Sequence, residues 1–197
     1  MFRTTVSRLL LSSAVLSVGL SSAQAQTFCE PGIGGVMTCP CGNNPSGLNR
    51  GCDNSLATGG AGMVMVGTPS LSLDTLQATC AGIGTSGPSC SGVITNNLAA
   101  LYQGSATIPG GVVFGDGVLC TSGLVILINA KPATNGGWRY PEFASDPSIS
   151  SISAANGDVL FVGATRYYFI AYRDSCPTFC NPSVRNKSNS YAVTWIP

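Results

Sequence analysis

Short apolar runs alternate with turn-forming residues along most of this chain. Glycine pairs and Asn-Gly or Asp-Pro steps recur roughly every ten residues, which is the spacing of turns in all-β proteins. Nine of the intervening runs have strand length, and several are rich in β-branched or aromatic residues. These predicted strands cover residues 63–66, 71–79, 98–103, 112–114, 124–128, 149–153, 159–162, 166–172 and 191–196. No segment has the length and the period of about 3.6 residues of a long helix, although residues 96–102 fit a helical turn as well as a strand.

The run at residues 166–173 is the clearest predicted strand, because both of its faces are apolar. One face carries Tyr168, Ile170 and Tyr172, and the other carries Tyr167, Phe169 and Ala171. Two apolar faces are typical of a central strand that is covered on both sides. The last run places Tyr191, Val193 and Trp195 on one face. The pattern predicts an all-β fold, an antiparallel β-sandwich of jelly-roll or Ig-like form with a disulfide-rich irregular N-terminal segment.

Residues 1–25 have the pattern of a secretory signal peptide. Arg3 and Arg8 precede an apolar stretch, and Ala23 and Ala25 form an A-x-A cleavage signal, so Gln26 becomes the first residue of the exported chain. The alternative is a membrane anchor, but the apolar stretch is shorter than the roughly 20 residues that span a bilayer. We therefore expect a secreted protein, extracellular or at the cell surface, with no membrane span after cleavage.

The remaining chain divides into two parts by composition. Residues 26–58 are dense in Cys, Gly, Asn and Pro, and residues 59–197 carry the predicted sandwich. The whole chain has 9 Lys+Arg against 8 Asp+Glu, and loss of the signal peptide removes two arginines. No basic surface for nucleic acid is therefore expected. The absence of histidine excludes a Ser-His-Asp triad, a Cys-His dyad and any histidine-ligated metal.

Nine cysteines in an exported chain predict disulfides. Spacing favours pairing among Cys29, Cys39, Cys41 and Cys52, a Cys80–Cys90 bridge around a turn-rich loop, and a Cys120–Cys180 bridge. Cys176 is then the odd thiol, free or linking two copies in a homodimer; the alternative is that it is simply buried or takes the place of Cys180. A thiolate metal site is the alternative at Cys39-Pro40-Cys41, although zinc sites favour at least two residues between paired cysteines.

A series of motifs carries a family resemblance. It includes Cys39-Pro40-Cys41-Gly42-Asn43 near the start and Phe114-Gly115-Asp116-Gly117 in the middle, and it ends with residues 193–197. The chain resembles an uncharacterised family of exported bacterial cysteine-containing β domains with CPCGN and FGDG motifs. The resemblance implies three bridges among Cys29, Cys39, Cys41, Cys52, Cys120 and Cys180. It implies Cys80–Cys90 as an added bridge and Cys176 as the odd thiol, and it implies no activity.

No set of residues stands out as catalytic. The eight carboxylates are Glu30, Asp53, Asp74, Asp116, Glu142, Asp146, Asp158 and Asp174, and any two of them are candidates for acid–base hydrolysis. Several lie in turns, where aspartate commonly accepts hydrogen bonds from nearby backbone instead. A Ser–Lys dyad would need Lys131 or Lys187. The protein needs no cofactor on this pattern, although calcium is a candidate ion at residues 115–117 and at Asn43, Asn44, Asn49, Asp53 and Asn54.

The glycine-flanked loop at residues 135–143 is the candidate ligand site. Trp138 and Tyr140 would form an exposed platform for a sugar ring, and Arg139 and Glu142 would hydrogen-bond its hydroxyls. The alternative is that Trp138 and Tyr140 cover the end of the sandwich as ordinary core residues.

Three functions follow as expectations. The first is a secreted non-catalytic extracellular module for adhesion, matrix or glycan binding, whose partner is an extracellular glycan or surface protein. The second is a self-associating structural subunit of a surface layer or fibre, which low charge and an odd cysteine would allow. The third is a small extracellular hydrolase.

Overall fold

The structure of the protein, a computed structural model, describes residues 25–84, 97–174, 176, 178–180 and 184–197. The predicted signal peptide lies outside these residues except for Ala25. Within them the chain forms eight strands and one helix. They are β1 (Ala25–Phe28), β2 (Gly62–Val66), β3 (Gln77–Ala81), β4 (Leu98–Phe114), β5 (Gly117–Pro132), β6 (Trp138–Tyr140), α1 (Ile149–Ala155), β7 (Thr165–Arg173) and β8 (Arg185–Thr194). No helix in the described ranges is long and apolar enough to cross a membrane.

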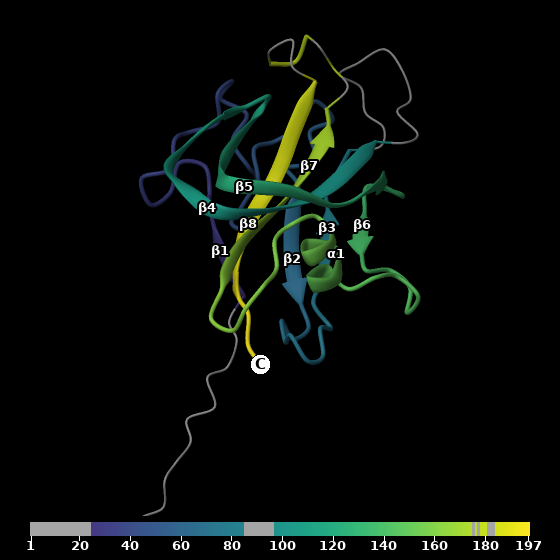
Figure 1. The fold of residues 1–197 in the computed structure, drawn as a ribbon. Coiled ribbons are helices and arrows are strands. Elements are labelled where there is room, and N and C mark those ends of the chain that lie inside the picture. The colour runs from purple at the N-terminus through teal and green to yellow at the C-terminus, as the bar shows by residue number, and fades with distance from the viewer. Residues whose placement is uncertain (1–24, 85–96, 175, 177, 181–183) are drawn as a thin grey trace, which may run out of the picture.

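The larger sheet contains five antiparallel strands in the order β1-β8-β7-β4-β5 (Figure 1). Its central strand is β7, as the two apolar faces of that run predict. Strands β4 and β5 form a long hairpin that closes between Phe114 and Gly117. Its turn requires glycine at position 115, because φ is +58° and a Cβ atom there would lie 2.1 Å from the carbonyl oxygen of Arg185. The tip of the hairpin therefore packs closely on the start of β8.

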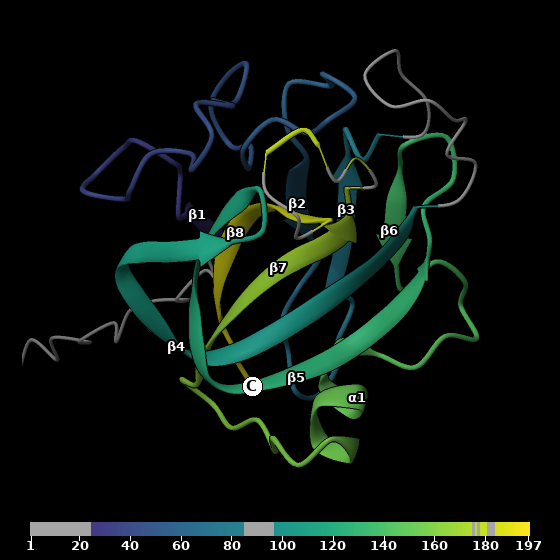
Figure 2. The same ribbon diagram turned by 90° about the horizontal axis from the view of Figure 1, so that it is seen from above.

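The smaller sheet contains three antiparallel strands in the order β2-β3-β6 and packs on the larger sheet (Figure 2). A side chain of β8 joins the two sheets. Asn189 Oδ1 accepts the backbone N–H of Met63 in β2 at 2.6 Å, and Asn189 Nδ2 donates to the Met63 carbonyl at 3.1 Å. On the other side, residues 133–137 carry the chain from β5 in the larger sheet to β6 in the smaller one. The predicted antiparallel β-sandwich is confirmed.

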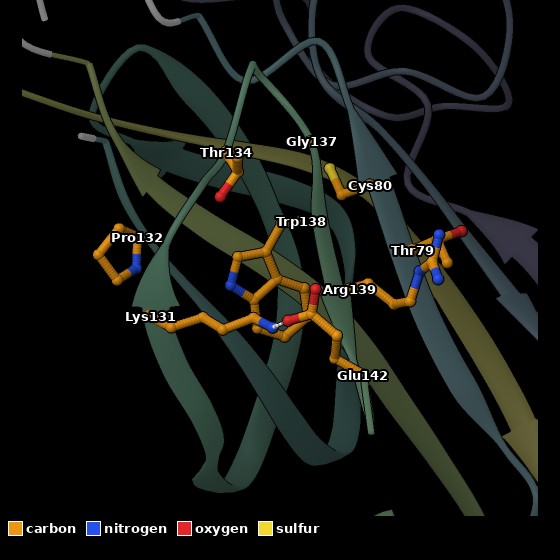
Figure 3. Close-up of a pocket in the computed structure, with 9 residues that line it drawn as sticks. All are labelled: Thr79, Cys80, Lys131, Pro132, Thr134, Gly137, Trp138, Arg139 and Glu142. Carbon is orange, nitrogen blue, oxygen red and sulfur yellow. Dashed lines mark hydrogen bonds and ion pairs between the residues drawn. The ribbon is translucent and has the colours of Figure 1, made fainter. Parts of the chain in front are cut away.

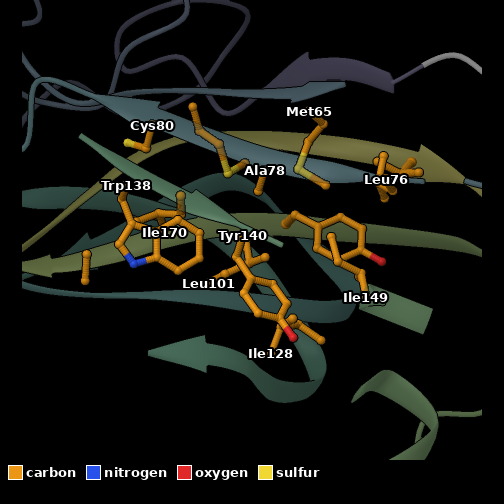
Figure 4. Close-up of a cluster of buried hydrophobic side chains, with 14 of the residues drawn as sticks. Met65, Leu76, Ala78, Cys80, Leu101, Ile128, Trp138, Tyr140, Ile149 and Ile170 are labelled. Atoms are coloured by element: carbon orange, nitrogen blue, oxygen red, sulfur yellow. The ribbon is translucent and has the colours of Figure 1, made fainter. Parts of the chain in front are cut away.

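Apolar side chains from both sheets fill the space between them (Figure 4). Met65 and Ala78 of the smaller sheet face Leu101 and Ile170 of the larger one. Trp195 lies directly after β8 and is fully buried, as the alternation of the last run predicts. Burial of this apolar surface is the main stabilising term of the fold.

A series of buried hydrogen bonds crosses the core. Trp195 Nε1 donates to the Tyr168 hydroxyl at 3.3 Å, and that hydroxyl donates to Gln103 Oε1 at 2.7 Å. Gln103 Nε2 donates to Asp158 Oδ2 at 2.7 Å, and Arg166 Nε donates to the same oxygen at 2.6 Å. The network ties the segment after α1 to the larger sheet. Because it lies in a buried environment, each of its groups depends on its partner to avoid a desolvation penalty.

Several predicted strands differ in the structure. Residues 149–153 belong to α1 instead, because Ser148 Oγ accepts the backbone N–H of Ser151 as a helix cap and Ile149 faces the core. Residues 159–162 form no strand. The run at 71–79 becomes strand only from Gln77 onward. Residues 98–103 and 112–114 belong to one strand, β4, since irregularities of register rather than a turn accommodate the glycines between them. Residues 96–102 form no helical turn over their described part.

Two of the three disulfides with both cysteines described link parts of the chain that are distant in sequence, and the third closes a short loop. They are Cys29–Cys120, Cys39–Cys52 and Cys41–Cys180. Of the pairing expected among the first four cysteines, only Cys39–Cys52 is right, and the expected Cys120–Cys180 bridge is wrong. The reason is the hairpin tip, where the backbone N–H of Asp116 donates to the Arg185 carbonyl at 2.8 Å, so that Cys120 is carried across β8 to Cys29.

The two remaining described cysteines exchange their expected roles. Cys80 is a free thiol that faces the core from the middle of β3, so its assignment to a bridge is wrong. Its expected partner, Cys90, lies outside the described residues. Cys176 is disulfide-bonded, which corrects its assignment as the odd thiol and removes the thiol that a Cys176-linked homodimer would need. Residues 29–61 form neither helix nor strand, and bridges anchor them to β5 and to Cys180.

Candidate functional site

A pocket lies where the chain passes from the larger sheet to the smaller one (Figure 3). Its volume is about 550 Å³. Strands β3, β5 and β6 and the connections around β6 contribute its walls. The lining residues are Thr79, Cys80, Lys131, Pro132, Thr134, Gly137, Trp138, Arg139 and Glu142.

Strand β6 divides the predicted site residues between two environments. Alternation along the strand turns Trp138 and Tyr140 toward the core, where they are 4% and 3% exposed, and turns Arg139 toward solvent. The predicted exposed aromatic platform is therefore wrong, and the alternative interpretation as core residues is confirmed. Pairing with β3 is the reason, since Trp138 lies opposite Cys80 and must face the same layer.

A tight turn positions the start of β6. Backbone hydrogen bonds of 2.9 Å connect Thr134 and Gly137 in both directions. Asn135 and Gly136 between them have φ values of +50° and +75°. A Cβ atom at position 136 would lie 2.7 Å from the carbonyl oxygen of Ile83, so glycine allows the turn to pack directly on the chain after β3.

An ion pair bridges the pocket. Lys131 near the end of β5 pairs with Glu142 after β6, and Figure 3 shows the two side chains meeting in front of the indole ring. The Lys131 ammonium also lies 5.7 Å from the centre of the Trp138 ring, which is within cation–π range. Asp146 holds the loop that carries Glu142, because its carboxylate accepts the backbone N–H groups of Glu142 and Phe143 at 2.7 and 3.0 Å. Those bonds hold the pKa of Asp146 below its ordinary value.

The indole N–H of Trp138 is a buried donor without a hydrogen-bond partner among the residues that the structure describes. Figure 3 shows this nitrogen on the side of the ring that faces Pro132. A buried donor that has lost its water and gained no acceptor costs roughly 1–3 kcal/mol. Since the ring lines the pocket, an acceptor bound there would remove that cost once the ion pair opens.

Three of the four predicted ligand residues line the pocket, Trp138 as a buried ring and Arg139 and Glu142 as exposed charged groups. Arg139 and Glu142 are exposed and line it, whereas Tyr140 donates its hydroxyl to the Pro147 carbonyl at 2.8 Å and does not line it. Lys131 and Thr79 were not predicted for the site. No local signal identifies them, because only the β3–β6 pairing and the end of β5 bring them to this loop.

Most of the carboxylates considered for acid–base chemistry have structural partners in the described chain. Asp53, Asp74, Asp146 and Asp174 each accept backbone N–H groups. Asp158 forms an ion pair with a β7 arginine, which lowers its pKa. These are the turn-capping and packing roles that the sequence offered as the alternative to catalysis.

Several of the candidate calcium ligands form hydrogen bonds with the backbone of this region. Asn43 Nδ2 donates to the backbone oxygens of Asp53 and Asp116 at 2.6 and 2.9 Å. Asp53 Oδ1 accepts three backbone N–H groups, among them those of Gly59 and Gly60. Among the residues that the structure describes, no three His, Cys, Asp or Glu side chains lie close enough to hold a metal ion together.

Comparisons with models of protein families, with curated proteins and with solved structures find no match to this chain. The resemblance to exported domains with CPCGN and FGDG motifs therefore stays a prediction.

Proposed function

We propose that the protein is a secreted, disulfide-stabilised extracellular module that binds a glycan in the pocket between β5 and β6 without chemical turnover. The signal-like N-terminus and the bridged cysteines support export, because disulfides persist in oxidising compartments. The pocket supports binding, since its polar groups come from several strands of a rigid sandwich.

The unpartnered indole N–H of Trp138 is the observation that carries this proposal. The pocket has further donors, the ammonium of Lys131, the guanidinium of Arg139 and the hydroxyl of Thr134, against the single carboxylate of Glu142. A site rich in donors favours a ligand rich in acceptors. A sugar that carries a carboxylate fits best, because its carboxylate can replace Glu142 on Lys131 while a ring oxygen or hydroxyl accepts the indole N–H.

A glycan array that contains neutral and uronic-acid oligosaccharides is the first test. We expect the wild-type protein to bind acidic oligosaccharides, and we expect calorimetry to show at least a tenfold weaker affinity for Trp138→Phe, which keeps the packing and removes the N–H. Arg139→Ala should weaken binding as well. Arg173→Ala is the matched control, since this arginine is exposed on β7 and does not line the pocket. Failure of the wild-type protein to bind any oligosaccharide on the array would refute the proposal.

Self-association is a second candidate, and the edge of the larger sheet favours it. Strand β5 ends the sheet on one side and exposes Leu124, Val125 and Leu127, the last at 44%. On this edge Asn156 Nδ2 donates a hydrogen bond to the Leu127 carbonyl oxygen at 3.2 Å. Sedimentation velocity over a range of concentrations tests this function. Leu127→Lys should dissociate any oligomer. Leu73→Lys, in an exposed loop, is the control and should leave the oligomer intact. A wild-type monomer at all concentrations would exclude it.

A further inference from the structure

A second and larger pocket, of about 650 Å³, contains a disulfide in its wall. It lies between β1, the loop that follows it, and the middle of β4. Most of its other lining residues are apolar, including Phe28, Ile33, Val36, Leu48 and Ile108. Both Cys29 and Cys120, which are bonded to each other, line it. A ligand in this pocket therefore lies against the two bonded cysteines.

A buried lysine lies behind that disulfide. Lys187 in β8 is 1% exposed, and its Nζ lies 3.8 Å from Cys29 Sγ and 3.2 Å from Ser190 Oγ. The ring centre of Phe169 is 5.7 Å from the same nitrogen. Within the described part of the chain, Lys187 forms no ion pair with a carboxylate. Burial without a counter-ion lowers the pKa of Lys187 to about 7. Of the two atoms that hydrogen-bond to Lys187 Nζ, the sulfur of Cys29 is the one that becomes an anion when its disulfide opens.

We propose that the Cys29–Cys120 disulfide is a thiol–disulfide exchange site, in which an apolar thiol enters the pocket and attacks Cys120 while Lys187 stabilises the departing Cys29 thiolate. The direction of attack follows from geometry, because the cation lies next to Cys29 and favours it as the leaving group. The apolar lining selects the class of thiol.

The step balances as a substitution at sulfur. The thiolate of the ligand forms a bond to Cys120 Sγ, the Cys29–Cys120 bond breaks, and its electron pair remains on Cys29 Sγ. The proton of the ligand thiol ends on the Lys187 amine when that amine is neutral, and in solvent when it is already an ammonium. A second thiol can then release Cys120 as a thiol and leave the ligand as a symmetric disulfide.

The bridge between Cys39 and Cys52 offers an internal comparison. Both of its cysteines are as buried as Cys29 and Cys120, but within the described residues no cation hydrogen-bonds to either sulfur. If burial alone decided reactivity, the two bridges would react alike. If the lysine and the pocket decide it, Cys29–Cys120 reacts first.

Peptide mapping of the folded protein after a short exposure to benzyl mercaptan tests the proposal. Free thiols are alkylated, and the adducts are located by mass spectrometry under non-reducing conditions. We expect a mixed disulfide on Cys120 and alkylation of Cys29, at a rate about tenfold above that of Cys39–Cys52. Lys187→Met should slow only the Cys29–Cys120 reaction, by about tenfold. An adduct on Cys29, or a Lys187→Met rate equal to that of the wild-type protein, would overturn the proposal.

A surface substitution keeps the test valid if Lys187→Met fails to fold. Ile33 lines the pocket and is 49% exposed, so Ile33→Asp adds a charge at the mouth without disturbing the core. It should slow the reaction with apolar benzyl mercaptan and leave the reaction with 2-mercaptoethanol unchanged. Leu73→Asp, at an exposed apolar position outside the pocket, is the matched control. Equal rates for Ile33→Asp and Leu73→Asp with benzyl mercaptan would contradict entry through this pocket.

Discussion

The Cys41–Cys180 bridge allows a clean measurement of how a disulfide stabilises this fold. Cys41 is exposed and Cys180 is only partly buried, so replacing both with alanine removes little packing. The bond spans 139 residues of sequence. With Cys29–Cys120 intact, however, a path of about 70 residues that crosses this second bridge also joins Cys41 to Cys180. Loop-closure entropy for about 70 residues corresponds to about 4 kcal/mol at 25 °C.

We therefore expect Cys41→Ala/Cys180→Ala to lose about 4 kcal/mol of the free energy of unfolding. Urea denaturation followed by fluorescence of the buried residues Trp138 and Trp195 measures this loss. The serine pair Cys41→Ser/Cys180→Ser should give the same value, since neither site is packed in the core. A loss below about 1 kcal/mol would refute the chain-entropy argument. A large difference between the alanine and serine pairs would show that local contacts, and not the closed loop, provide the stability.

Three further outcomes are expected. Asp158→Asn should lower the free energy of unfolding by about 3 kcal/mol at pH 7, because it leaves Arg166 without its buried partner. The pKa of Asp158 is lowered in the folded state, so this contribution is present above about pH 4 and is lost as the pH falls through the folded-state pKa. The stabilities of the wild-type and variant proteins, measured over an acid titration, should therefore converge at low pH. The pKa of Lys187 is lowered to about 7 in the folded protein, so between pH 7 and 9 the unfolded chain binds a proton that the folded chain has lost. The free energy of unfolding of the wild-type protein should therefore rise by roughly 2 kcal/mol over this range. Lys187→Met should abolish the rise. Burial raises the pKa of Cys80 to about 12, so iodoacetamide at pH 8 should leave it unmodified in the folded protein and modify it after unfolding without reductant; labelling of the native thiol would contradict its place in the core.

The alternation of side chains between two faces correctly predicted strands in which each face has the same environment along its whole length. The run that became β7 has apolar residues on both faces, and the structure places it at the centre of the larger sheet. The prediction failed where a short apolar run fits both the two-residue period of a strand and the 3.6-residue period of a helix. Residues 149–153 carry Ile149 and Ile152 on one helical face, and the cap at Ser148 decides for helix.

At the candidate site, too, the local sequence identified the segment but did not decide which of its side chains are buried. The loop at residues 135–143 was identified from its glycines, its aromatic residues and its charges. Whether Trp138 would be exposed depended on its partner strand, because opposite residues of paired strands share a face and Cys80 points into the core. Lys131 reaches the site from β5, and no local pattern indicates that contact.

The sequence by itself determined the class of fold, the low charge and the presence of disulfides. These properties depend on period, composition and residue type, which are local or additive along the chain. Only the tertiary structure decided which cysteines pair, which aromatic residues are buried, and that Lys187 lies beside Cys29. Each of those facts depends on how the β4–β5 hairpin crosses β8 and how β6 joins β3. Such contacts between residues far apart in sequence are decided by the packing of whole strands, and no short segment contains them.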